Sequence, residues 1–170
     1  MAWAPAALLL ASNGARADPA IQREDQFKAA YVFNFVKFVE WPGDVSLDPV
    51  TICFVGAEGV YEALTASIDS KRAGSRRLVA RRVADAPAAG TCNALYVEAA
   101  MVSRHSPIQE RAVLTISDSK NFVANGGMIE LFTENHRLRF RINARSAQRA
   151  GLRISSDLLK LAVGVHREPR

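Results

Sequence analysis

Residues 50–56 read VTICFVG, a continuous apolar run rich in β-branched and aromatic side chains, which predicts a buried strand. Residues 58–68 follow with apolar side chains at steps of four, as in a helix, and residues 76–83 are again extended in pattern. A strand, a helix and a second strand in this order usually place both strands parallel in one sheet. The chain is therefore predicted to be an α/β protein.

Further apolar segments extend this unit into a mixed sheet of five to six strands flanked by helices. Residues 93–97 and 112–116 predict two short buried strands, and Ser106-Pro107 between them predicts a helix start. Residues 128–133 and 137–143 flank a polar turn and predict an antiparallel hairpin near the C-terminus.

The second arm of this hairpin alternates between apolar and basic residues, so its two faces should differ. We expect the apolar set to face inward and the basic set outward. The inward set is Leu138, Phe140 and Ile142, and the outward set is Arg137, Arg139 and Arg141.

Two more helices are predicted at the ends of the domain. Residues 22–41 carry aromatic and β-branched side chains at steps of three and four, and Pro42-Gly43 ends the run. The apolar stripe is wider than a surface helix needs, so this helix is either buried on several sides or part of an interface. Ser155-Ser156 cap a last helix that runs to Ala162.

The chain has 170 residues, 49% hydrophobic and 23% charged, which is an ordinary composition for one globular domain. Residues 1–17 differ from the rest. A short apolar run at residues 4–11 leads to Ala15-Arg16-Ala17, a small-x-small pattern typical of signal-peptidase cleavage. We therefore expect residues 1–17 to be a cleavable signal peptide and residues 18–170 to form a single exported domain. No later segment reaches the ~20 apolar residues of a transmembrane helix.

The two cysteines, Cys53 and Cys92, both lie in or beside predicted buried strands. In an oxidising compartment they could form a disulfide, and as reduced thiols they would serve as small apolar core residues. Their separation, with no histidine at ligand spacing, argues against a zinc site.

No catalytic constellation is recognisable, and we expect neither an enzyme nor a bound cofactor or metal. His105, His136 and His166 are far apart and lie in polar surroundings. The turn at Gly56 before a helix resembles a phosphate-binding turn, but Glu58 is unfavourable there and a plain connecting turn is the better interpretation. A small-molecule or cell-wall-fragment pocket near Gly56 is the alternative function.

The net charge of +5 and a pI near 9.6 raise the question of an anionic partner. The arginines of the hairpin could continue through Arg145, Arg149 and Arg153 as a basic stripe. Glu130 and Glu134 lie on the opposing arm and could pair with these arginines, and no aromatic residues interleave for base stacking. We therefore expect no nucleic acid partner, and the stripe is either a solvated sheet face or a surface for an anionic partner.

Residues 28–42, KAAYVFNFVKFVEWP, resemble the opening segment of the YfiR/HmsC family. Segments further along the chain are similar to that family in the same order, and together they cover nearly all of the expected mature chain. These segments are residues 52–56, 92–97, 113–118, 122 with 126–129, 139–143, and 151–156 running into 158–162.

The resemblance implies a periplasmic regulator with a mixed α/β fold that tends to form homodimers. Such regulators restrain an inner-membrane diguanylate cyclase by contacting its periplasmic sensor region, and cyclic-di-GMP output falls. An outer-membrane lipoprotein can capture the regulator and release the cyclase. Cys53 and Cys92 match a disulfide of the family, whereas a second cysteine pair of some members is absent, which leaves redox control through that pair without support.

Binding a protein requires an apolar patch with a polar rim. The wide first helix and the hairpin arginines are the candidates for this interaction surface. Its expected residues are Phe35, Phe38, Trp41, Arg137, Arg139 and Arg141.

Overall fold

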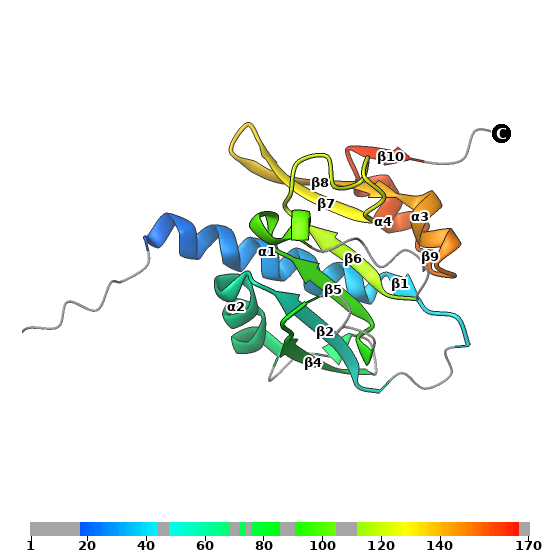
Figure 1. The fold of residues 1–170 in the computed structure, drawn as a ribbon, viewed down its shortest axis with the longest axis horizontal. Coiled ribbons are helices and arrows are strands. Elements are labelled where there is room, and N and C mark those ends of the chain that lie inside the picture. The colour runs from blue at the N-terminus through cyan, green and yellow to red at the C-terminus, as the bar shows by residue number, and fades with distance from the viewer. Residues whose placement is uncertain are drawn as a thin grey trace, which may run out of the picture.

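The computed structural model describes residues 18–43, 48–68, 72–73, 76–85, 91–104 and 112–166. Its main sheet has eight strands, and Figure 1 shows them as one twisted layer with helices packed against it. The strand order is β10 (Gly164–His166), β8 (Arg137–Asn143), β7 (Ile129–Glu134), β6 (Leu114–Ser117), β5 (Ala94–Val97), β2 (Val50–Val55), β4 (Arg76–Arg82) and β3 (Arg72–Ala73).

The predicted fold class, a mixed α/β domain with an antiparallel hairpin near the C-terminus, is confirmed. The central run β4–β2–β5–β6–β7 is parallel from strand to strand, β7 and β8 are antiparallel, and at the edges β3 is antiparallel to β4 while β10 is parallel to β8. The sheet has more than the expected five to six strands because β3 and β10, of two and three residues, lengthen its edges.

The strand–helix–strand unit forms as predicted from β2, α2 (Glu58–Ile68) and β4. β2 is buried on both faces, which explains its unbroken apolar sequence. Ile52 and Phe54 pack in the larger core with the helices, whereas Cys53 and Val55 face the opposite side of the sheet.

The first helix, α1 (Pro19–Lys37), begins where Asp18 accepts a hydrogen bond from the Ala20 backbone N–H at 2.8 Å. The prediction that it runs to Trp41 is wrong at the C-terminal end. Val39–Glu40 form strand β1, which pairs antiparallel with β9 (Arg153–Ile154). The backbone groups of these two residues are therefore satisfied by a distant segment and not by a further helical turn.

One side of α1 packs against the sheet and against α2. The residues buried on this side are Ala29, Val32, Phe35 and Val36. Its N-terminal turns extend beyond the strands (Figure 1). Phe27, in the N-terminal half of the helix, keeps 56% of its surface exposed.

After the hairpin, the chain forms α3 (Ala144–Arg149), which the sequence pattern did not predict. Asn143 caps it, because its side-chain oxygen accepts from the Ser146 N–H at 2.9 Å. The last helix, α4 (Ser156–Leu161), is confirmed with Ser155 as its cap. The 3-10 helix η2 (Ala99–Arg104) precedes the helix start expected at Ser106-Pro107, which lies outside the described residues.

The second face of the sheet carries a smaller apolar cluster. The structure joins Cys53 of β2 to Cys92 by a disulfide with a Cα–Cα distance of 5.9 Å, as the family resemblance implied. Val55, Leu95 and Val97 pack around it. The crosslink therefore ties the segment before β5 to the centre of the sheet.

Within the described ranges, no helix is both long enough and apolar enough to span a bilayer.

Candidate interaction surface

The hairpin arginines alternate outward as predicted, but they do not share one environment. In the β7–β8 register, Glu130 lies opposite Arg141 and Glu134 opposite Arg137. Arg141 forms an ion pair with Glu130 (Nη1 to Oε1, 3.0 Å), and its guanidinium lies 3.8 Å from the ring centroid of Phe132. Glu130 is almost fully buried, so this pair belongs to the framework of the domain.

Arg137 and Arg139, nearer the hairpin tip, are exposed. Neither of them forms an ion pair in the part of the chain that the structure describes, although Glu134 is the register partner of Arg137. The expected continuation of the basic stripe is not a flat sheet face, because Arg145 and Arg149 lie on α3 and Arg153 lies on β9. Among the described residues, the cations without an ion-pair partner next to the hairpin tip are Arg137 and Arg139, and the exposed Glu134 lies beside them.

The aromatic residues expected at the same surface lie elsewhere. Phe35 is completely buried, and its ring packs against that of Phe140 at 5.0 Å between centroids. Trp41 is 5% exposed and donates from Nε1 to the backbone oxygen of Asn93 at 3.0 Å. Phe38 is partly buried beside the core. A contact surface that needs Phe35 and Trp41 is thus not present on this structure, because both side chains are part of the core.

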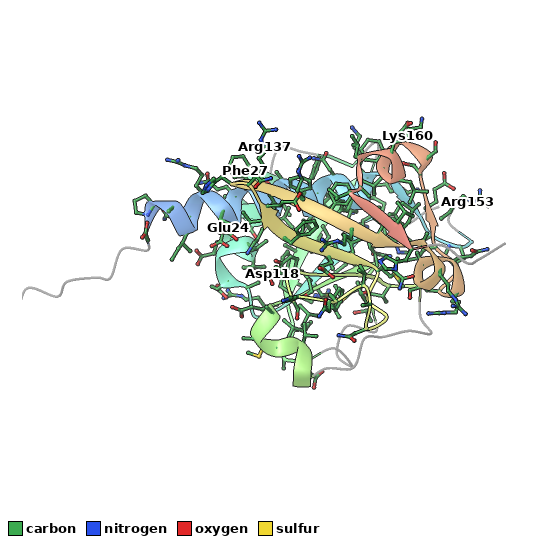
Figure 2. The ribbon with its side chains drawn as sticks, turned by 90° about the horizontal axis from the view of Figure 1, so that it is seen from above. Glu24, Phe27, Asp118, Arg137, Arg153 and Lys160 are labelled. Carbon is green, nitrogen blue, oxygen red and sulfur yellow. A yellow bond between two sulfur atoms is a disulfide. The ribbon has the colours of Figure 1, made fainter. Side chains whose placement is uncertain are left out.

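A groove of about 340 Å³ lies between the N-terminal half of α1 and the hairpin tip. Figure 2 shows Phe27 and Arg137 close together at this end of the molecule. We call it the aromatic–arginine groove, and its lining residues are Phe27, Tyr31, His136, Arg137, Leu138 and Arg139. The sequence pattern placed Phe27 and Tyr31 on one helix face but gave no signal that this face meets the hairpin.

An ionic cluster lies where α1 passes the carboxyl ends of β5 and β6. Lys28 contacts Asp118 (Nζ to Oδ2, 2.7 Å) and Glu24 (Nζ to Oε1, 2.9 Å). Asp118 also accepts from the Ala99 N–H at 3.0 Å. Burial, and then the nearby Asp118 carboxylate, raise the pKa of Tyr96, so its phenol stays protonated. The ion pair of Lys28 with Asp118 therefore connects α1 to the segment that follows β6.

Asp25 in this cluster carries a pKa raised above 3.8, first by burial and then by neighbouring carboxylates, with Lys28 opposing. Between pH 3.8 and the higher pKa of the folded state, the folded state holds more protons than the unfolded state, and stability falls as the pH rises through that window. We expect Asp25→Asn to stabilise the domain at pH 7 by less than about 1 kcal/mol, because water screens a partly buried group. The gain should vanish below pH 3.8, as followed by urea unfolding across pH, and a variant less stable than wild type at pH 7 would contradict this.

The turn at Gly56 is occupied by the protein's own carboxylate. Gly56 and Ala57 both have positive φ angles, and the Ala57 N–H donates to Glu98 Oε2 at 3.0 Å. A Cβ at Gly56 would come within 2.3 Å of the same oxygen. Because Glu98 fills the position that a phosphate would take, the turn is a plain connection.

The histidines do not come together into a site. His136 lies in the hairpin turn, His166 ends β10, and His105 is outside the described residues. Over the described ranges, no group of three or more His, Cys, Asp or Glu side chains is arranged to hold a metal ion.

The chain is similar to solved structures and matches one protein family. A solved conserved domain protein of Vibrio cholerae O1 biovar eltor is similar with a TM-score of 0.51 and 11% identity. An ABC domain in complex with L-Trp from Streptococcus pneumonia matches with a TM-score of 0.47 and 12% identity. Each match covers 83% of this chain, and the chain spans 60% of either protein's length.

The first of these similarities supports the fold alone. The family model described as DUF4154, YfiR/HmsC-like, matches residues 25–163, from the middle of α1 to the end of α4 and beyond. The chain therefore belongs to the YfiR/HmsC-like family.

Proposed function

We propose that this protein represses an inner-membrane diguanylate cyclase by binding the periplasmic sensor region of that enzyme, which lowers cyclic-di-GMP signalling. The observation that carries the proposal is the family match over residues 25–163. At the level of the family, the match supports a periplasmic regulatory role without enzymatic activity. The diguanylate cyclase as partner, a homodimeric state and capture by an outer-membrane lipoprotein are parts of the proposal.

The disulfide supports a location outside the cytoplasm. Disulfides persist in oxidising compartments such as the periplasm, and Cys53–Cys92 ties two buried segments together. Export through a signal peptide at residues 1–17 completes this part of the proposal, and those residues lie outside the described chain.

Repression by binding requires a difference in affinity between two states of the cyclase. The regulator must bind the inactive arrangement of the sensor region more tightly than the active one. A preference of about 1.4 kcal/mol changes the ratio of the two states by about tenfold. Capture by a lipoprotein would lower the free concentration of the regulator and return the cyclase to its active arrangement.

The proposal predicts that producing this protein together with the cyclase lowers cellular cyclic-di-GMP, by up to about tenfold at the affinity difference above. Cyclic-di-GMP is measured by mass spectrometry of cell extracts. Two controls separate this from indirect effects: the chain without residues 1–17, which should stay in the cytoplasm, and a cyclase without its periplasmic region. Unchanged cyclic-di-GMP on both production and deletion of the exported chain would rule the function out.

A further inference from the structure

The aromatic–arginine groove combines an exposed aromatic side chain with two arginines that form no ion pair within the described chain, although the exposed Glu134 lies opposite Arg137 in the strand register. Phe27 is 56% exposed although most large apolar side chains of the domain are buried. Arg137 and Arg139 stand beside it, and none of the lining residues is acidic. Arginine and aromatic residues are enriched where proteins bind one another, and charged residues without partners favour a complementary surface.

The floor of the groove is held in place by contacts between α1 and β8. The Tyr31 hydroxyl donates to the Leu138 backbone oxygen at 3.1 Å, and its ring lies 5.7 Å from that of Phe140 between centroids. Phe140 in turn packs on Phe35 inside the core. A groove with a fixed floor loses little conformational entropy when a ligand binds.

The outer edge of β8 has no neighbouring strand near the hairpin tip, and the Tyr31 hydroxyl of α1 occupies its Leu138 backbone oxygen. β10 pairs only with Arg141, Ile142 and Asn143, so the preceding residues of β8 have no strand beyond them in the described part of the chain. An incoming segment would therefore contact the exposed Phe27 and the side chains at the hairpin tip and would not extend the sheet.

The two groups of hairpin arginines differ in what they contact. Arg141 is matched by the buried Glu130 and by the ring of Phe132. Arg137 and Arg139 have no ion-pair partner among the described residues. Arg141 therefore stabilises the fold, whereas Arg137 and Arg139 remain available to bind a ligand.

We infer that the aromatic–arginine groove docks an acidic segment of a partner protein, with an apolar side chain of that segment on Phe27 and its carboxylates on Arg137 and Arg139. This inference rests on the proposed function, because it takes the cyclase sensor region as that partner. A volume of about 340 Å³ fits a few side chains of a peptide segment, which favours a protein over a flat lipid surface.

The test measures binding of the purified periplasmic region of the cyclase to the full exported chain by isothermal titration calorimetry. The groove variants are Phe27→Ser and the double charge reversal Arg137→Glu with Arg139→Glu. The matched control is Arg153→Glu with Lys160→Glu, two exposed cations at the other end of the molecule (Figure 2). Each groove variant should raise Kd by at least about tenfold, and the control should stay within about twofold.

The dependence of the affinity on ionic strength distinguishes the contribution of Arg137 and Arg139 from that of Phe27. Wild-type affinity should fall as NaCl rises from about 50 to about 300 mM, because salt screens exposed charge pairs. The double reversal should flatten that dependence, whereas Phe27→Ser should weaken binding and keep the slope. Urea unfolding of each variant confirms that the domain still folds.

The binding measurements distinguish an incorrect assignment of the groove from an incorrect proposed function. If wild type binds the sensor region and both groove variants bind equally well, the groove assignment is wrong and the proposed function stands. If wild type does not bind the sensor region, both are wrong. A groove variant that changes only the homo-oligomeric state, or only binding to anionic phospholipid vesicles, also overturns the assignment to an acidic protein segment.

Discussion

Replacing both Cys53 and Cys92 with Ala is expected to lower the free energy of unfolding by about 4 kcal/mol. The two residues are 39 positions apart, and the crosslink removes the corresponding chain entropy from the unfolded state. Both side chains are also buried in the smaller cluster on the second face of the sheet, so their loss removes apolar contacts there. The measurement is urea unfolding of the purified domain followed by circular dichroism.

The reduced wild-type protein separates the crosslink from the packing. Reduction breaks the bond while leaving both sulfur atoms, so the change from oxidised to reduced wild type reports the crosslink. The Ala variant should not respond to the reductant. Equal stability of oxidised and reduced wild type would show that this disulfide does not stabilise the fold.

The parts of the fold that the sequence predicted are those set by local pattern. β2 is apolar at every position because both of its faces are buried, and α2 repeats its apolar residues at steps of four. The hairpin followed from alternation along β8. In each case one segment of chain contains the whole signal.

The parts that the sequence did not predict depend on contacts between distant segments. The apolar periodicity of α1 continues through Val39, yet Val39–Glu40 leave the helix to pair with Arg153–Ile154, more than a hundred residues away. Periodicity also cannot distinguish a core aromatic from an interface aromatic, which is why Phe35 and Trp41 were expected on a surface.

The candidate site divides in the same way. The outward direction of Arg137, Arg139 and Arg141 and the pairing of Glu130 with an arginine were predicted from strand alternation. The groove was not, because it exists only through the contact of Tyr31 with Leu138, which are 107 positions apart. Of the six residues expected at the interaction surface, only Arg137 and Arg139 line this groove.

The second large expected effect concerns the ion pair under the hairpin. Arg141→Ala should lower the free energy of unfolding by about 3 kcal/mol, because it leaves the Glu130 carboxylate buried without a cation. Glu130 has 4% of its side chain exposed, and its other oxygen accepts from the Val123 N–H at 3.2 Å. It therefore cannot turn to solvent without breaking the connection between β7 and the preceding loop. Urea unfolding at pH 7 provides the measurement.

A second substitution shows whether the uncompensated charge is the cause. Adding Glu130→Gln to Arg141→Ala removes the charge while keeping an acceptor for the Val123 N–H, and should recover at least about 1 kcal/mol. Arg139→Ala on the same strand is the matched control, with a loss below about 0.5 kcal/mol, because that side chain is exposed and forms no ion pair within the described chain. If the double variant is less stable than Arg141→Ala alone, the stability lost in Arg141→Ala comes from the packing of Arg141 on Phe132 and not from the uncompensated Glu130 carboxylate.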